Sequence, residues 1–194
     1  DMKWPSLKSI DAISEQAVRI VNAFGDKEVT SVMPSIGLEQ EFFLVDRDDF
    51  LKREDLVMTG RTLFGAMPSK GQELETHYFG AIPERVQKFM EDVNVQLWKL
   101  GIYAKSEHNE VAPAQFELAP IFGPVNIAID QNAIIMDVLQ RTALRHNLVC
   151  LLHEKPFKGV NGSGKHNNWS LITNTGVNPV SYTHLRAHET LSDL

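Results

Sequence analysis

Three separate stretches of the chain carry the residue types needed to bind divalent metal ions. Glu39 and Glu41 lie two residues apart, Glu110 and Glu117 lie seven apart, and His166 follows a glycine-rich run. Four carboxylates with one imidazole suit Mg²⁺ or Mn²⁺ better than Zn²⁺, which favours cysteine and histidine. So many acids indicate two ions, and paired ions commonly hold phosphate oxygens during phosphoryl transfer. The spacing alone leaves open whether these carboxylates meet in space.

The first acidic pair is expected on a mostly buried strand, residues 36–45. Side chains alternate along a strand, so Glu39 and Glu41 share one face. The neighbouring run from Phe42 to Val45 is apolar. Two adjacent carboxylates on such a strand repel each other and are costly to bury unless a cation compensates. The alternative is an acidic pair that faces solvent.

The second acidic pair has an odd spacing, which would place Glu110 and Glu117 on opposite faces of a regular strand. Pro113 lies between them, and proline is not tolerated inside a central ladder. A turn or bulge at this proline would return both carboxylates to one side. The neighbouring Glu107 and His108 are also candidate ligands, but they are expected to be loop residues.

The glycine-rich run, residues 159–170, holds three glycines within six positions and then His166. Glycine lets the backbone adopt positive φ and approach a ligand closely, and residues 170–173 are expected to form a strand. A solvated Gly/Asn turn with a surface histidine is the alternative. Neither a P-loop nor a kinase glycine loop is present, so a nucleotide site would be of another kind.

Apolar periodicity predicts the elements that must position these residues. Residues 47–70 are expected to be rich in loops. Helices are expected at 9–24, 83–100 and 124–146, and further strands at 102–105 and 148–153.

Length and composition indicate one globular domain, or part of a larger one: 194 residues, 43% apolar and 23% charged. The net charge of −6 gives no reason to expect a nucleic acid or an anionic membrane as partner. No apolar run is long enough to span a membrane, and no export signal opens the chain. The single cysteine, Cys150, is expected to be a buried hydrophobe rather than a nucleophile. A chain without an internal disulfide suits the reducing cytoplasm.

Several motifs stand together between residues 4 and 179. They are Gly37-Leu38-Glu39-Gln40-Glu41-Phe42-Phe43, Arg61-Thr62-Leu63-Phe64-Gly65-Ala66, Lys70-Gly71-Gln72, His77-Tyr78-Phe79-Gly80, Asn109-Glu110-Val111-Ala112-Pro113, Gln115-Phe116-Glu117, Lys155-Pro156 and Asn161 to Ser170. In these motifs the chain resembles the glutamine synthetase family, most closely its large type III form. The resemblance implies an α+β fold with helices packed on an antiparallel sheet, the guanido-kinase-like architecture of the catalytic domain, here incomplete.

The resemblance also implies an activity and a set of metal ligands. The family joins glutamate and ammonium at the expense of ATP, through γ-glutamyl phosphate, using two Mg²⁺ or Mn²⁺ ions. By motif, Glu41, Glu110 and Glu117 resemble ligands of the ion on the glutamate side. Glu39 and His166 resemble ligands of the ion beside the ATP phosphates, which stabilises charge on the moving phosphoryl group.

Substrate contacts and assembly are implied in the same way. Asn161 and the Gly162 backbone resemble positions that hold the amino acid end of glutamate. Phe122, Asn168 and Ser170 resemble nucleotide-contacting positions, although one branch of the family has histidine where Asn168 stands. The family's stacked rings imply a homododecamer with active sites between subunits.

The chain departs from the family abruptly after Pro179. Residues 1–179 are interpreted as part of a catalytic domain that lacks the family's upstream β domain and its downstream ligands. Residues 180–194 resemble a translated sequencing adapter, so a metal site at His184 and His188 is rejected. Two other functions remain open: a related carboxylate–amine ligase, such as a γ-glutamyl-polyamine synthetase or a glutamate–cysteine ligase, and a non-catalytic relative.

Overall fold

A computed structural model describes residues 3–180 and divides the chain into two compact units. Within the described residues, one unit comprises 3–37, 122–129 and 168–180, and the other comprises 38–121 and 130–167. Apart from Val180, the predicted non-native tail at 180–194 lies outside the described residues, and its origin stays a prediction.

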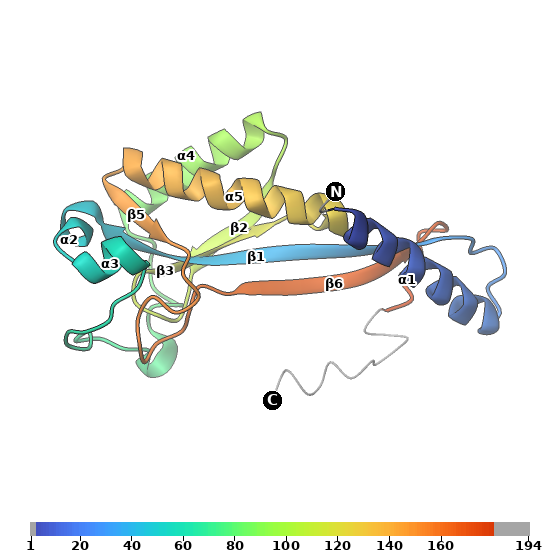
Figure 1. Cartoon of the computed structure of the whole chain (residues 1–194), viewed down its shortest axis with the longest axis horizontal. Helices are drawn as coiled ribbons and strands as arrows, with labels where there is room; N and C mark the ends of the chain where they lie inside the picture. The colour runs from blue at the N-terminus through green and yellow to red at the C-terminus, as the bar shows by residue number, and fades with distance from the viewer. Residues whose placement is uncertain (1–2, 181–194) are drawn as a thin grey trace. The chain divides into compact units, whose positions relative to one another are not determined.

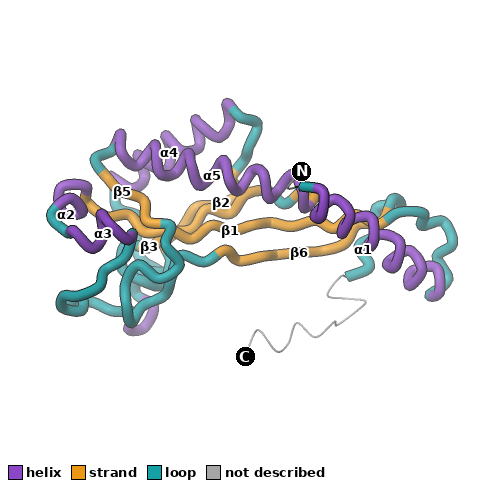
Figure 2. Tube along the Cα trace, viewed as in Figure 1, coloured by secondary structure: helices purple, strands orange, loops and turns teal. Residues whose placement is uncertain are grey.

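The strand β1 (Val32–Asp46) organises a six-stranded sheet. It pairs with β3, β4, β5 and β6, and β2 joins the sheet through β3. These strands are β2 (Ala104–Asn109), β3 (Gln115–Pro120), β4 (Gly123–Pro124), β5 (Leu148–Leu151) and β6 (Lys165–Thr173). The pairings of β1 with β3, β4 and β5, and of β2 with β3, are antiparallel. Figure 2 shows β1 running along the sheet beside β6.

Two long helices, α4 (Glu84–Lys99) and α5 (Val125–Arg145), cover one face of the strands in the second unit (Figure 1). Phe42 of β1 is buried in the resulting core and meets the ring of Phe89 of α4 edge-on, with centroids 6.1 Å apart. Ile135 and Leu139 of α5 are fully buried in the same core. Burial of these large side chains fixes the face on which alternate residues of β1 lie.

The opposite face of β1 is buried by a second apolar cluster. Phe43, the neighbour of Phe42, packs there with Leu56, Leu151 and Val160. Near the centre of β1, the side chains on both faces of the strand are thus buried. A strand that is buried on both faces is an unfavourable place for carboxylates, so Glu39 and Glu41 are unusual there.

The segment 47–70 is rich in loops, as predicted, but it also contains two short helices that were not predicted, α2 (Arg47–Leu51) and α3 (Glu54–Thr59). The Asp46 carboxylate accepts a hydrogen bond from the Asp48 N–H at 2.9 Å and caps α2. This capping satisfies one of the helix's free N–H groups and explains why the strand turns directly into a helix.

The other predicted elements are present with shifted ends. The first helix, α1 (Trp4–Ala23), begins earlier than expected, and a 3-10 turn occupies Glu73–Glu75. The placement of Glu107 and His108 in a loop was wrong, because both lie on β2. The mixed helical and antiparallel architecture confirms the predicted fold class. Within the described residues, no helix combines the length and hydrophobicity needed to cross a bilayer.

Candidate metal and substrate site

Strand register places an acidic row across the sheet. Glu41 of β1 is the direct partner of Glu117 on β3, and Glu117 is in turn the direct partner of His108 on β2. Side chains directly opposite one another on antiparallel strands lie close together. Three neighbouring strands therefore present a carboxylate, a second carboxylate and an imidazole side by side.

The turn between β2 and β3 brings Glu110 to this row. Gln115 donates its N–H to the Ala112 carbonyl at 3.2 Å, and Glu110 donates its own N–H to the Gln115 carbonyl at 2.9 Å. Ala114 within the turn has a φ of 58°. In a regular strand, the odd spacing would place Glu110 and Glu117 on opposite faces. The irregular turn around Pro113 interrupts the alternation and brings both carboxylates to the same side.

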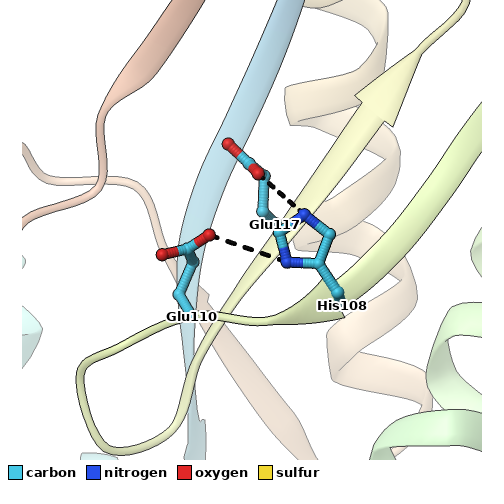
Figure 3. Close-up of side chains that lie close together, drawn as sticks. All are labelled: His108, Glu110 and Glu117. Carbon is cyan, nitrogen blue, oxygen red and sulfur yellow. Dashed lines mark ion pairs between the residues drawn. The ribbon is translucent and has the colours of Figure 1, made fainter. Parts of the chain in front are cut away.

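His108 lies between the two carboxylates of the turn (Figure 3). Its Nε2 is 2.9 Å from Glu117 Oε2, and its Nδ1 is 3.6 Å from Glu110 Oε1. The three residues supply ligand atoms that all lie within 4.8 Å of one another. The glutamate side chains are only 12% and 7% exposed, so this is a shielded cluster.

The carboxylates of the cluster destabilise one another as anions. Burial, together with the negative charges of Glu39 and Glu110, raises the pKa of Glu117 to about 7. Burial and the charge of Glu41 also raise the pKa of Glu110. The structure thus brings all four glutamates within electrostatic range. A divalent cation would offset both the cost of burying these carboxylates as anions and their mutual repulsion.

The Glu41 carboxylate is held by backbone and amide donors. Oε2 accepts hydrogen bonds from the Gly164 N–H at 2.8 Å and from Gln115 Nε2 at 3.3 Å. The backbone N–H of Glu41 donates to the Gly164 carbonyl at 3.1 Å. Glu41 is therefore fixed in orientation by the glycine-rich loop that precedes β6.

The remaining two metal-ligand candidates meet each other. Nδ1 of His166, near the start of β6, lies 2.9 Å from Oε2 of Glu39. The His166 side chain is 65% exposed, whereas that of Glu39 is 24% exposed. This pair offers an imidazole and a carboxylate at the accessible end of the cluster, and the charge of Glu39 acts on both Glu110 and Glu117.

The two glutamate-binding candidates lie on a loop tied to the acidic row. The Gly162 carbonyl accepts a hydrogen bond from Gln115 Nε2 at 2.7 Å, and Asn161 Oδ1 accepts one from Gln72 Nε2 at 3.1 Å. A pocket is lined by Glu41, Asn161 and Gly162 together. The loop therefore places polar backbone and an amide beside a candidate metal ligand.

The nucleotide-contacting candidates belong to the other compact unit and are described separately. Phe122 is 64% exposed and lies next to Gly37, where a Cβ would sit 3.5 Å from Phe122 Cβ. Asn168 is exposed on β6. The Ser170 hydroxyl is buried and has no hydrogen-bond partner among the described residues.

Reasoning from the sequence gave no site role to Gln115, and it placed His108, a nearby ligand candidate, in a loop. The alternation that would have placed His108 beside Glu117 depends on the number of residues in the turn, which the sequence does not fix. Gln115 was visible only as part of a motif. Its one further signal was a polar residue directly between the apolar Ala114 and Phe116, and its side chain is buried, with 1% exposed.

Comparison with known proteins gives the family. The family model for the glutamine synthetase catalytic domain matches residues 15–194. The chain belongs to the glutamine synthetase catalytic-domain family. The predicted family is thereby confirmed, and its relatives include the type III form.

Two relatives are similar over most of this chain. A glutamine synthetase of Butyrivibrio fibrisolvens is 56% identical over 172 residues, which is 89% of this chain and 25% of that protein. A type-3 glutamine synthetase of Dictyostelium discoideum is 50% identical over 178 residues, which is 92% of this chain and 24% of that protein. The chain thus spans about a quarter of the length of these relatives.

A solved structure shares the glutamine synthetase fold. The cryoEM structure of Plasmodium falciparum glutamine synthetase aligns with a TM-score of 0.55 at 20% identity, covering 86% of this chain and 34% of that one. At this identity the likeness concerns the fold alone. It agrees with the arrangement of helices on an antiparallel sheet.

Proposed function

We propose that this chain supplies the metal-binding part of a glutamate–ammonia ligase, which joins ammonium to glutamate with ATP and releases glutamine, ADP and phosphate. The observation that carries the proposal is the cluster of four glutamates, in which burial, and then the negative charges of the neighbouring glutamates, raise the pKa of Glu110 and of Glu117. Membership in the glutamine synthetase family supports the same activity.

The donor set fits the divalent ions that the family implies. It consists of carboxylate oxygens with imidazole nitrogens, which suit Mg²⁺ and Mn²⁺. Glu41, Glu110 and Glu117 would hold one ion, and Glu39 with His166 would hold the other. When bound, the ions neutralise charge on the phosphate oxygens of ATP and on the transferred phosphoryl group.

The protein groups bind and orient the substrates. The Gly162 backbone and the Asn161 amide would receive the amino acid end of glutamate beside Glu41. Phe122, Asn168 and Ser170 would contact the nucleotide. The γ-carboxylate of glutamate then accepts the phosphoryl group from ATP, and ammonia displaces phosphate from the resulting γ-glutamyl phosphate.

The proposal extends to the setting of the enzyme. Family membership favours a cytoplasmic homo-oligomer, a dodecamer, whose substrates are glutamate, ammonium and ATP. Neither nucleic acid nor a membrane is proposed as a partner.

Mn²⁺ titration of this chain tests the metal site. Mn²⁺ should raise the melting temperature of the wild type because it binds only the native state. Glu110→Ala should remove that increase, and the exposed Glu91→Ala variant should keep it. Equal melting temperatures of the wild type with and without Mn²⁺ would instead favour a non-catalytic relative.

Phosphate release by the complete protein tests the reaction. Release should require both glutamate and ammonium. Release with glutamate and a polyamine, or with glutamate and cysteine, but not with ammonium, would point to a related carboxylate–amine ligase instead.

A further inference from the structure

We propose that His108 Nε2 is an additional, nitrogen ligand of the ion held by Glu110 and Glu117, and that it biases this site toward Mn²⁺ over Mg²⁺. This inference rests on the proposed metal site. The ligand set given above for that ion consists of carboxylates alone, and His108 has no role in it.

The first argument is the position of the ring hydrogen. His108 Nδ1 lies 3.0 Å from the Asn109 carbonyl oxygen, an atom that can only accept a hydrogen bond. A hydrogen on Nδ1 leaves the lone pair of the neutral ring on Nε2. Metal-binding histidines usually donate their other ring N–H to a carbonyl or a carboxylate in this way, which fixes the tautomer and the ring orientation.

The second argument is the contact made by Nε2. It lies 2.9 Å from Glu117 Oε2, as Figure 3 shows. Two atoms that both present lone pairs repel at this distance unless a proton or a metal ion lies between them or beside both. Neighbouring ligands about 2.1 Å from an octahedral ion are about 3.0 Å apart. The separation of Nε2 and Oε2 therefore matches two ligands of one ion.

The third argument is that the ring is held in place from several sides. The T-shaped contact with Tyr78, at a centroid distance of 5.7 Å, packs one side of the imidazole. Asn109, the next residue, is buried and donates its side-chain amide to the Gly80 carbonyl at 2.7 Å. The pairing of His108 with Glu117 fixes the backbone. A ligand held before the ion arrives binds it at a lower entropic cost.

The ligand chemistry predicts the metal preference. Imidazole nitrogen suits transition-metal ions, whereas Mg²⁺ favours carboxylate, carbonyl and water oxygens. A site with one nitrogen and several carboxylates should therefore bind Mn²⁺ in preference to Mg²⁺. Loss of the nitrogen should reduce Mn²⁺ affinity more than Mg²⁺ affinity.

Pulsed electron paramagnetic resonance of this chain with bound Mn²⁺ tests the nitrogen ligand directly. Histidine labelled with ¹⁵N identifies coupling from an imidazole. His166 offers a second nitrogen, so the decisive sample is His166→Ala. We expect histidine nitrogen coupling to persist in His166→Ala and to disappear in the His108→Ala, His166→Ala double variant.

Isothermal titration with Mn²⁺ and with Mg²⁺ provides a second readout. His108→Ala should lower Mn²⁺ affinity at least about tenfold and change Mg²⁺ affinity less than threefold, so the Mn²⁺/Mg²⁺ preference falls. Equal losses for both ions would indicate a merely structural role and overturn the inference.

The outcomes separate this inference from the proposed function. If Mn²⁺ binds the wild type, fails to bind Glu110→Ala, and shows no histidine coupling in His166→Ala, the metal site stands and the His108 ligand is wrong. If the coupling seen in His166→Ala is unchanged in the double variant, it comes from another histidine and His108 is again excluded. If Mn²⁺ does not bind the wild type, the proposed metal site and the ligand both fail.

Discussion

The Gln115 side-chain amide links Glu41 to the loop beside it. Gln115 Nε2 donates to Glu41 Oε2 at 3.3 Å and to the Gly162 carbonyl at 2.7 Å, while Gln115 Oε1 accepts from the Ala112 N–H at 3.2 Å. One buried amide thus joins a candidate metal ligand, a candidate substrate loop and the turn before β3. Its loss should affect all three.

Gln115→Leu should destabilise the chain by about 1–3 kcal/mol, because it leaves the buried N–H of Ala112 without a partner and removes one of the two donors to the Gly162 carbonyl. Urea unfolding monitored by circular dichroism measures the change. The matched control is Gln87→Leu on the exposed surface of α4, which should alter the free energy of unfolding by less than about 0.5 kcal/mol. Equal effects of the two substitutions would show that the Gln115 hydrogen bonds contribute nothing.

Gly162→Ala should displace the loop that holds Asn161. A Cβ at Gly162 would lie 1.9 Å from the Glu154 carbonyl oxygen, a backbone atom that has no rotamer to change. We expect a loss of about 1–3 kcal/mol in unfolding free energy and weaker thermal stabilisation by Mn²⁺.

Gly123→Ala is the matched control for the loop substitution, because no atom lies within 4 Å of the Cβ it would add. Its melting temperature should stay close to that of the wild type. An unchanged melting temperature in Gly162→Ala as well would mean that the loop has more room than the structure shows.

Asp55 should contribute stability that depends on pH. The Arg53 guanidinium, followed by the N–H groups of Leu63 and Leu56, holds the pKa of the buried Asp55 carboxyl below its ordinary value of 3.8. The folded pKa is lowered, so this stability is present above about pH 5 and is lost as the pH falls through the folded pKa.

Acid unfolding of Asp55→Asn measures this contribution. Its melting temperature should fall below that of the wild type by several degrees at pH 6, and the gap should narrow as the pH approaches 2. Asp49→Asn is the control, since the Asp49 side chain is 76% exposed. A gap that is constant across this pH range would exclude ionisation of Asp55 as the cause.

Glu107 should show the opposite dependence on pH. Burial raises the pKa of Glu107 to about 7, although Asn94 Nδ2 donates to its carboxylate at 2.8 Å. With a raised folded pKa, the protonated group costs nothing at low pH, and a penalty develops as the pH rises from about 4.5 through about 7.

Glu107→Gln removes that penalty and keeps an acceptor for Asn94. It should stabilise the chain at pH 8 by about 1–3 kcal/mol and have little effect at pH 4. Glu91→Gln on the exposed face of α4 serves as control. Destabilisation by Glu107→Gln at pH 8 would show that the ionised carboxylate is favoured in the folded protein.

The helix α4 could be predicted because it buries a regularly spaced set of side chains. The spacing of Val86, Phe89, Val93 and Leu97 predicts α4, and all four are buried in one core. The helix α2 was missed because its signal is local and short. Asp46 caps only five residues, and no apolar periodicity develops over that length.

In the candidate site too, the features that depend on local sequence could be predicted, and those that depend on the fold could not. The shared face of Glu39 and Glu41 follows from alternation, which does not depend on distant residues. The partnership of His108 with Glu117 depends on strand register, and register across an irregular turn is a property of the fold. The roles of the five predicted metal ligands stay predictions until a metal is measured.

The two contacts between Glu41 and Gly164 couple ligand access to the integrity of the sheet. Glu41 donates its amide to the Gly164 carbonyl, and Gly164 returns its own amide to the Glu41 carboxylate. The loop beside the candidate ligand cannot swing away without freeing an amide of β1, so its breathing is a local unfolding event. The amide hydrogens of Glu41 and Gly164 should therefore exchange with deuterium at a common rate, one that slows when metal occupies the site.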